Sequence, residues 1–110
     1  DYPHGECNAI LLSEVVRANF SAVPDRYRRI AAVMDLNEAD MTDDEVKDIL
    51  VKEITLLAHK AGVYQKLSNL GVTEEDIPRL TENALRDPCL STNPKELTAG
   101  EITQIYERCL

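Results

Sequence analysis

The longest amphipathic pattern in the sequence begins at residue 42 and predicts a helix. Thr42 is followed three positions later by Glu45, the spacing of a capping box, in which each side chain bonds to the other residue's backbone N–H group. Apolar residues then recur at helical spacing, at Val46, Ile49, Leu50, Ile54, Leu57, Ala58 and Ala61. Gly62 follows, at the position where a left-handed residue commonly ends a helix. The sequence therefore predicts a helix from about residue 42 to residue 61.

Four more segments show the same kind of pattern, and short punctuated loops separate them. They cover residues 6–19, 25–34, 73–87 and 98–110. The last of them opens with a second capping box, formed by Thr98 and Glu101. No alternating apolar and polar run bounded by turns indicates a strand. The chain is therefore predicted to be all-α, with residues 1–110 forming a single helical domain.

Composition and charge exclude several classes of function. Apolar residues make up 44% of the chain and charged residues 29%, which is ordinary for a soluble globular protein. The net charge of -8 argues against non-specific nucleic-acid binding, which needs clustered Lys and Arg. No segment is long and apolar enough to cross a membrane. Three cysteines fit a reducing compartment better than a disulfide framework. We expect a cytoplasmic protein that binds neither nucleic acid nor membranes.

Charged side chains within the helices receive a structural interpretation. Arg26, Arg28 and Arg29 could grip a phosphate, but in so acidic a chain they predict a solvated helix face. His59 lies in the last turn of the 42–61 helix, where a cationic side chain complements the helix dipole. We interpret His59 as structural rather than as a metal ligand.

A second histidine stands immediately before the first predicted helix. His4 lies between Pro3, whose ring fixes φ, and Gly5, which permits backbone conformations or close approaches that a Cβ would block. Because a neutral imidazole is the commonest side-chain metal ligand, His4 is a candidate ligand held at a helix entrance. The alternative is a surface or capping histidine beside a turn.

The residues around His4 resemble a known metal-binding segment. Pro3-His4-Gly5, then Asn8-Ala9 and Ile10-Leu11-Leu12, resembles the stretch that carries the last metal-ligand histidine of iron-containing (group III) alcohol dehydrogenases. Ser13 stands where that family usually has proline, a departure that affects helix geometry more than chemistry.

The far end of the chain resembles the same family. Asp76-Ile77-Pro78, residues 84–89 and Thr92-Asn93-Pro94 are similar to the family's C-terminal stretch. With this order and spacing, the resemblance covers essentially all 110 residues. It is specific at the two ends and generic in the helices between them.

The resemblance implies the C-terminal half of a two-domain enzyme with the dehydroquinate synthase-like fold. In that family an N-terminal α/β domain binds NAD(P), and the helical domain supplies an Asp and three His to a divalent metal, iron or alternatively zinc. Of these four ligands, only His4 would belong to this chain. The metal acts as a Lewis acid on the oxygen of a small alcohol or aldehyde while hydride passes to or from the nicotinamide. The 110 residues alone are expected to be inactive, and the start at Asp1, inside a motif, suggests a piece of a longer protein.

Two further expectations concern the surface of this domain. Composition alone predicts that Cys89 is an ordinary buried cysteine beside a turn, whereas the resemblance places its loop near the substrate side of the metal cleft. We therefore expect the loop 89–94 to approach His4, with Cys89 lining the substrate pocket without acting as a nucleophile. The first helix is apolar on several sides, which predicts that the isolated chain self-associates through Leu12, Val16 and Phe20.

A non-enzymatic interpretation is the alternative. An acidic helical interaction module could hold a partner through its apolar grooves and its negative surface. The two interpretations differ in what precedes Asp1. An α/β half followed by a histidine-rich stretch would support the enzyme, and a start near Asp1 would support the interaction module.

Overall fold

The computed structural model describes residues 4–36, 38–63 and 65–110, and every regular element in these ranges is helical. The α-helices are α1 (His4–Asn19), α2 (Pro24–Val33), α3 (Asp43–Lys60), α4 (Ile77–Arg86) and α5 (Ala99–Cys109). Short 3-10 helices join them: η1 (Phe20–Ala22), η2 (Glu38–Asp40), η3 (Leu67–Leu70), η4 (Glu74–Asp76) and η5 (Pro88–Thr92). The prediction of an all-α chain is confirmed.

The predicted capping boxes form as the sequence spacing indicates. The N–H of Glu45 donates to Thr42 Oγ1, and the N–H of Thr42 donates to Glu45 Oε1, both at 3.2 Å. Gly62 has a φ of 93°, so it is the left-handed residue that ends α3. One predicted helix is divided, because η4 precedes α4 and Pro78 lies in the first turn of α4, where no N–H is needed.

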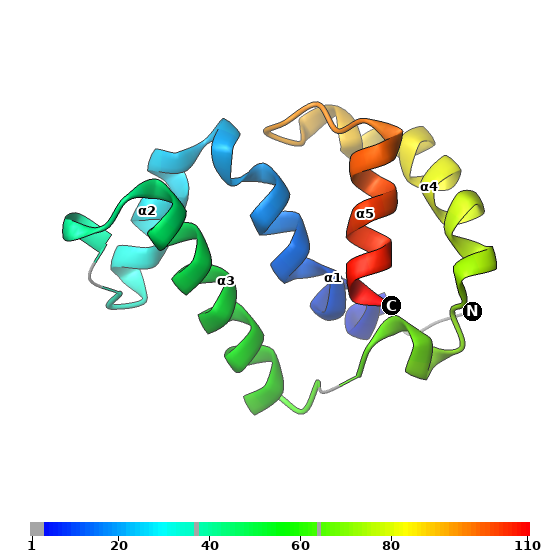
Figure 1. Cartoon of the computed structure of the whole chain (residues 1–110), viewed down its shortest axis with the longest axis horizontal. Helices are drawn as coiled ribbons and strands as arrows, with labels where there is room; N and C mark the ends of the chain where they lie inside the picture. The colour runs from blue at the N-terminus through cyan, green and yellow to red at the C-terminus, as the bar shows by residue number, and fades with distance from the viewer. Residues whose placement is uncertain (1–3, 37, 64) are drawn as a thin grey trace.

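Helix α1 is the central element, with α3 on one side and α5 on the other (Figure 1). Ser13 and Thr55 share a hydrogen bond of 2.8 Å, and Arg17 lies 3.5 Å from Asp48, so α1 and α3 run antiparallel. Helix α4 packs on α5, and α2 packs on α3 at the end of α1 opposite His4. The C-terminal end of α5 returns to the start of α1, where Cys109 Sγ donates to the carbonyl of Ile10 at 3.6 Å.

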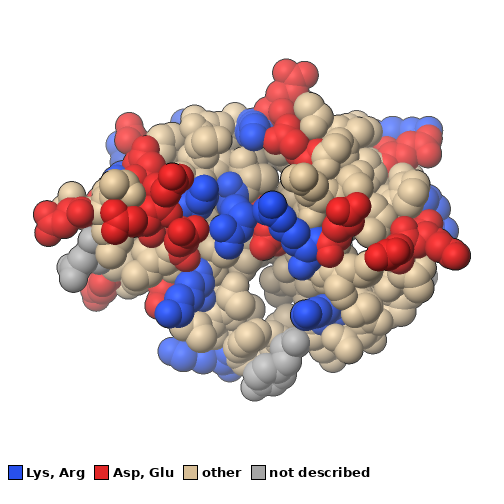
Figure 2. Space-filling view, in the orientation of Figure 1, with Lys and Arg blue, Asp and Glu red and all other residues tan. Residues whose placement is uncertain are grey.

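Charged side chains of both signs cover the face seen in Figure 2, and Lys and Arg gather across its middle. The described ranges include no helix with the length and the apolar composition that a membrane span requires.

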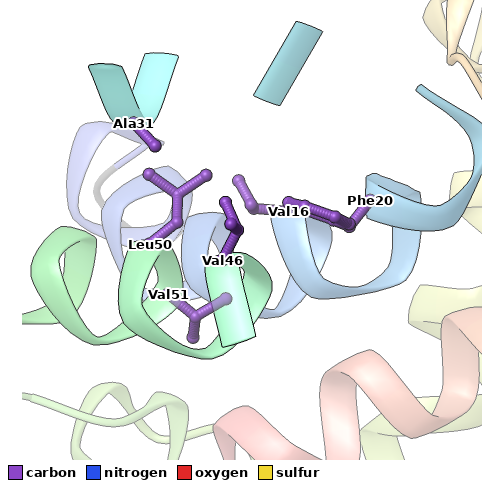
Figure 3. Packing of buried hydrophobic residues seen from close by; sticks show 6 residues of the cluster. All are labelled: Val16, Phe20, Ala31, Val46, Leu50 and Val51. Carbon is purple, nitrogen blue, oxygen red and sulfur yellow. The ribbon is translucent and has the colours of Figure 1, made fainter. Parts of the chain in front are cut away.

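The largest buried cluster joins α1, η1, α2 and α3 (Figure 3). Its members are Val16, Phe20, Ala31, Val46, Leu50 and Val51. The predicted self-association face is therefore wrong in part, because Val16 and Phe20 are buried inside the chain. Helix α2 covers them, and the ring of Tyr27 stacks on Phe20 with centroids 5.5 Å apart. Two smaller clusters lie on the α5 side, around Leu67, Val72 and Cys109 and around Leu97, Ile102 and Ile105.

Arg28 does not lie on a solvated face, which corrects part of the sequence interpretation. Its guanidinium donates to the carbonyls of Glu38 and Met41, each at 2.7 Å, and to the carboxylates of Glu38 and Asp43 at 3.1 and 2.9 Å. The hydrogen bond to Asp43 is the main cause of the raised Arg28 pKa. Arg28 thus ties α2 to the loop before α3, whereas Arg26 and Arg29 are exposed as predicted.

Candidate functional site

His4 is the first residue of α1, and its side chain is exposed. The sequence places His4 before the helix, but the structure includes both His4 and Gly5 in the first turn. Gly5 does not have a positive φ, and a Cβ there would meet no heavy atom of the described residues within 4 Å, so those residues do not themselves require glycine. Pro3, the other half of the predicted turn, lies outside the described residues.

The imidazole of His4 is held by Asn8, one helical turn away. Asn8 Nδ2 donates to His4 Nε2 at 3.1 Å. A carboxamide can donate through its nitrogen or accept through its oxygen, so Asn8 can support either tautomer of the ring. Leu12 follows one turn further on, which places His4, Asn8 and Leu12 along one exposed side of α1.

The chemistry of His4 fits a single metal ligand. A neutral imidazole is a good ligand for zinc or iron, and a metal-ligating histidine usually donates its other ring N–H to an outer partner. Asn8 Nδ2 instead donates to Nε2, so Asn8 would fill the outer-partner role by accepting from the ring N–H through its amide oxygen. Among residues 4–36, 38–63 and 65–110, no group of three or more His, Cys, Asp or Glu is placed to hold a metal ion. The described part of the chain therefore offers His4 as one ligand and not as a complete site.

Cys89 lies at the opposite end of α1 from His4, so the expected approach of its loop to His4 is wrong. Asn93, in the same loop, bonds to Asn19 at the last turn of α1. His4 and Asn19 are the two ends of a 16-residue helix, which separates them by roughly 22 Å along the axis. The assignment of Cys89 to a substrate pocket therefore loses the proximity on which it rested. Cys89 is also exposed rather than buried, with its N–H bonded to Asp87 Oδ1 at 2.8 Å.

His59 is exposed in the last turn of α3, and its structural interpretation stays a prediction. It borders a shallow groove of about 210 Å³ that Ser13 and Thr55 also line. His59 belongs to no cluster of metal-ligating residues in the part of the chain that the structure describes. Its position favours the dipole role over a ligand role.

A groove of about 330 Å³ between α1, α3 and α5 was not predicted from the sequence. Its basic lining residues are Arg17, Lys47, Lys95 and Arg108, and its acidic ones are Glu14, Asp43, Asp44 and Glu101. The Glu14 carboxylate forms ion pairs with the guanidinium groups of Arg17 at 3.5 Å and Arg108 at 3.4 Å. The Lys95 ammonium lies 2.7 Å from the Glu101 carboxylate. Lys95 is also the main cause of the lowered Glu101 pKa. Because the charges cancel within the groove, its electrostatics favour neither an anion nor a cation.

A family model decides which proteins this chain is related to. The model described as the Fe-containing alcohol dehydrogenase family, C-terminal, matches residues 1–110. The chain belongs to this family. The resemblance inferred from the two ends of the sequence is thereby confirmed over the whole chain.

Individual relatives agree with the family model. The chain is 38% identical to a lactaldehyde reductase of Escherichia coli K12 over 104 residues, which are 94% of this chain and 27% of that protein. It is 34% identical to a 1,3-propanediol dehydrogenase of Citrobacter freundii over 108 residues, covering 98% of this chain and 28% of that protein. The chain thus spans little more than a quarter of the length of these two relatives.

A solved structure has the same fold. The crystal structure of a 1,3-propanediol oxidoreductase is similar with a TM-score of 0.93 and 34% sequence identity, covering 100% of this chain and 29% of that chain. The helical arrangement around α1 is therefore that of the C-terminal part of an iron-containing alcohol dehydrogenase.

Proposed function

We propose that these 110 residues are the C-terminal part of an NAD(P)-dependent alcohol dehydrogenase in which His4 ligates a divalent metal. The observation that carries the proposal is the match of the family's C-terminal model to every position from 1 to 110. The exposed His4 imidazole, oriented by Asn8, supports the ligand role. The substrate class is a small alcohol and the corresponding aldehyde or ketone.

The role of His4 in this proposal is to donate an electron pair and not to move a proton. When bound, the metal supplies Lewis-acid chemistry at the oxygen of the substrate, and iron or zinc would suit an imidazole ligand. Asn8 holds the ring at a fixed angle to α1, and α1 is fixed in turn by its packing on α3 and α5. The remaining ligands and the NAD(P) site would belong to the rest of the enzyme, including its N-terminal nucleotide-binding domain.

The acidic interaction module is not favoured. Nothing in the comparisons points to that class, since the relatives described above have the names of enzymes. In the 330 Å³ groove the charges are balanced rather than complementary to a charged partner.

Metal analysis of the longer enzyme tests the proposal. In the dehydrogenase that contains these residues, His4→Ala should lower bound metal and alcohol oxidation together, because one coordination bond is lost. The matched control is His59→Ala, which removes the other histidine of the chain and should leave both quantities unchanged. Normal metal content and turnover in His4→Ala would overturn the ligand role.

Calorimetric titration of the 110-residue chain with zinc gives a second test. A single imidazole leaves the other coordination positions to water, so binding should be weak. Stoichiometric submicromolar binding would contradict the proposal, because it would require a complete site within the chain.

A further inference from the structure

We propose that a shallow hollow between α1, α3 and α5, named here the basic hollow, binds a phosphate dianion, either free or as the end group of a small phosphate monoester. The hollow has a volume of about 520 Å³, and its described lining residues are Glu14, Arg17, Lys47 and Arg108. Glu14 and Arg17 belong to the second half of α1, whereas His4 is the first residue of that helix. The site is therefore separate from the candidate metal ligand and goes beyond the proposed function.

The basic hollow carries an excess of positive charge in an acidic chain. Its described lining has three cations and one carboxylate, which leaves two positive charges, whereas the whole chain has a net charge of -8. The adjoining 330 Å³ groove is balanced because Asp43, Asp44 and Glu101 also line it, and these three do not line the hollow. In Figure 2, Lys and Arg gather over α1 between α3 and α5. The positive charge is therefore local, and it favours an anion.

Glu14 does not neutralise the two arginines of the hollow. Arg17 Nε at 3.5 Å and Arg108 Nη1 at 3.4 Å approach the same carboxylate oxygen, Glu14 Oε2. Arg17 Nη1 also lies 3.5 Å from Asp48 Oδ1, but Nη2 of both guanidiniums has no partner among the described residues. Two guanidiniums thus meet at one oxygen atom and keep N–H donors for the forked contacts that arginine makes to phosphate.

The other acidic partners of these cations are exposed to solvent. The side chain of Asp48, the second partner of Arg17, is 69% exposed. The side chain of Asp44, which lies 3.4 Å from Lys47, is 90% exposed. Exposed ion pairs of this kind contribute little to stability and are screened by salt. A phosphate dianion can therefore replace them at little cost in stability.

Charge and donor number select the ligand. A phosphate group carries roughly -1.5 to -2 charges at neutral pH, which matches the two positive charges in excess. Its oxygens can accept from two guanidiniums and an ammonium together, and such charge-assisted bonds are stronger than neutral ones. The volume of about 520 Å³ also leaves room for the rest of a small monoester.

Calorimetric titration of the longer enzyme with inorganic phosphate, at constant ionic strength, tests the site. Arg17→Gln and Arg108→Gln should each weaken phosphate binding about tenfold, because each removes charge-assisted hydrogen bonds. Glu14→Gln should tighten phosphate binding, because it removes the acidic group from the described lining of the hollow. Lys47→Gln should weaken binding and keeps the test decisive if Glu14→Gln folds poorly.

A second titration, with glycerol 3-phosphate, separates the two sources of the phosphate group. Binding at least as tight as that of inorganic phosphate identifies a monoester as the ligand. Binding about tenfold weaker identifies free phosphate, because the ester group is then excluded. In both cases Arg17→Gln should weaken the binding that is measured.

Arg79→Gln is the matched control, because Arg79 has the same charge but lies on α4 and pairs with Asp76 outside the hollow. It should leave phosphate affinity unchanged, and the comparison among variants separates the hollow from any phosphate bound elsewhere in the enzyme. Unchanged affinity in both Arg17→Gln and Arg108→Gln would overturn the inference. Weaker binding in Glu14→Gln, or equal displacement of phosphate by chloride, would also overturn it, since these results indicate a structural role or simple screening. The readout is neither metal content nor turnover, so failure of the His4 ligand role leaves this test intact.

Discussion

Asn19 and Asn93 exchange two hydrogen bonds through their side-chain amides. Asn19 Nδ2 donates to Asn93 Oδ1 at 2.9 Å, and Asn93 Nδ2 donates to Asn19 Oδ1 at 2.8 Å and to the carbonyl of Lys95 at 2.6 Å. Asn19 is only 3% exposed. The pair joins residues 74 positions apart and fastens the segment before α5 to the end of α1.

Removing one amide of this pair should destabilise the fold. Asn93→Ala leaves the buried Asn19 amide without this partner, which costs about 1–3 kcal/mol. Urea unfolding of the 110-residue chain measures the change. Thr92→Ala, at an exposed neighbouring position, is the control and should change the unfolding free energy by less than about 0.5 kcal/mol.

A double-mutant cycle separates the pair from its surroundings. Asn19→Ala combined with Asn93→Ala should cost less than the sum of the two single substitutions, because neither amide is then left without its partner. If the two losses of unfolding free energy simply add, the two side chains contribute independently, and the mutual hydrogen bonds do not stabilise the fold as a pair.

The helices could be predicted from the sequence because their signals are local. A capping box needs two residues three positions apart, so Thr42 with Glu45 and Thr98 with Glu101 mark the starts of α3 and α5 without any tertiary information. The left-handed Gly62 is equally local. Where the local signal is weaker the boundary shifts, as at α1, which begins two residues before the predicted Glu6.

The packing could not be predicted in the same way, because it depends on the direction in which each loop returns. Helical spacing shows that Val16 and Phe20 share a stripe, but not that α2 folds back over it. It also gives no sign that Asn93 pairs with Asn19, which moves the loop containing Cys89 away from His4. His4 could be proposed as a ligand from its motif alone, whereas a complete metal site needs groups that the described residues do not supply.

Asn8 should influence metal binding through His4. In the longer enzyme, Asn8→Ala frees the imidazole to rotate, and loss of such an outer partner typically costs about 10–100-fold in metal affinity. Asn8→Asp keeps a hydrogen-bonding oxygen beside the ring and should retain most of the affinity. Competition with a chelator, followed by metal analysis, provides the measurement.

Thermal unfolding of the metal-free protein checks the alternative explanation for a loss of affinity. Alanine is a better helix former than asparagine, so Asn8→Ala at this exposed position should not lower stability. Unchanged metal affinity in Asn8→Ala would show that the bond to His4 has no role in metal binding.

The buried thiol of Cys109 should make the fold less stable at alkaline pH. Burial, followed by the nearby negative charge of Glu14, raises the pKa of Cys109 from 9.0 to about 11. Between these values the unfolded chain releases the thiol proton and the folded chain keeps it, so stability falls as pH rises. The shift corresponds to roughly 3 kcal/mol, fully present below pH 9 and lost by about pH 11.

A comparison with the Cys109→Ala variant isolates this contribution. The pKa of Tyr106 is also raised by burial, and its titration adds a loss of the same sign at high pH. Cys109→Ala should therefore reduce the decline in unfolding free energy between pH 9 and pH 11 without abolishing it. A decline of the same size in Cys109→Ala would exclude the thiol as its cause.

Self-association of the isolated chain is the last prediction, now assigned to a different surface from the one that the sequence indicates. Val16 and Phe20 are buried, whereas Leu12 on α1 and Leu57 on α3, here called the open face, are among the large apolar side chains that stay exposed and can pair. Symmetric dimers are the commonest way to cover such a surface. Sedimentation of the 110-residue chain over a concentration series should show dimers at high concentration, and Leu57→Glu should shift the equilibrium to monomer. Val33→Glu replaces an even more exposed apolar residue at the end of α2 and serves as the control, because it lies outside the open face. Equal effects of the two substitutions would indicate non-specific association rather than pairing through the open face.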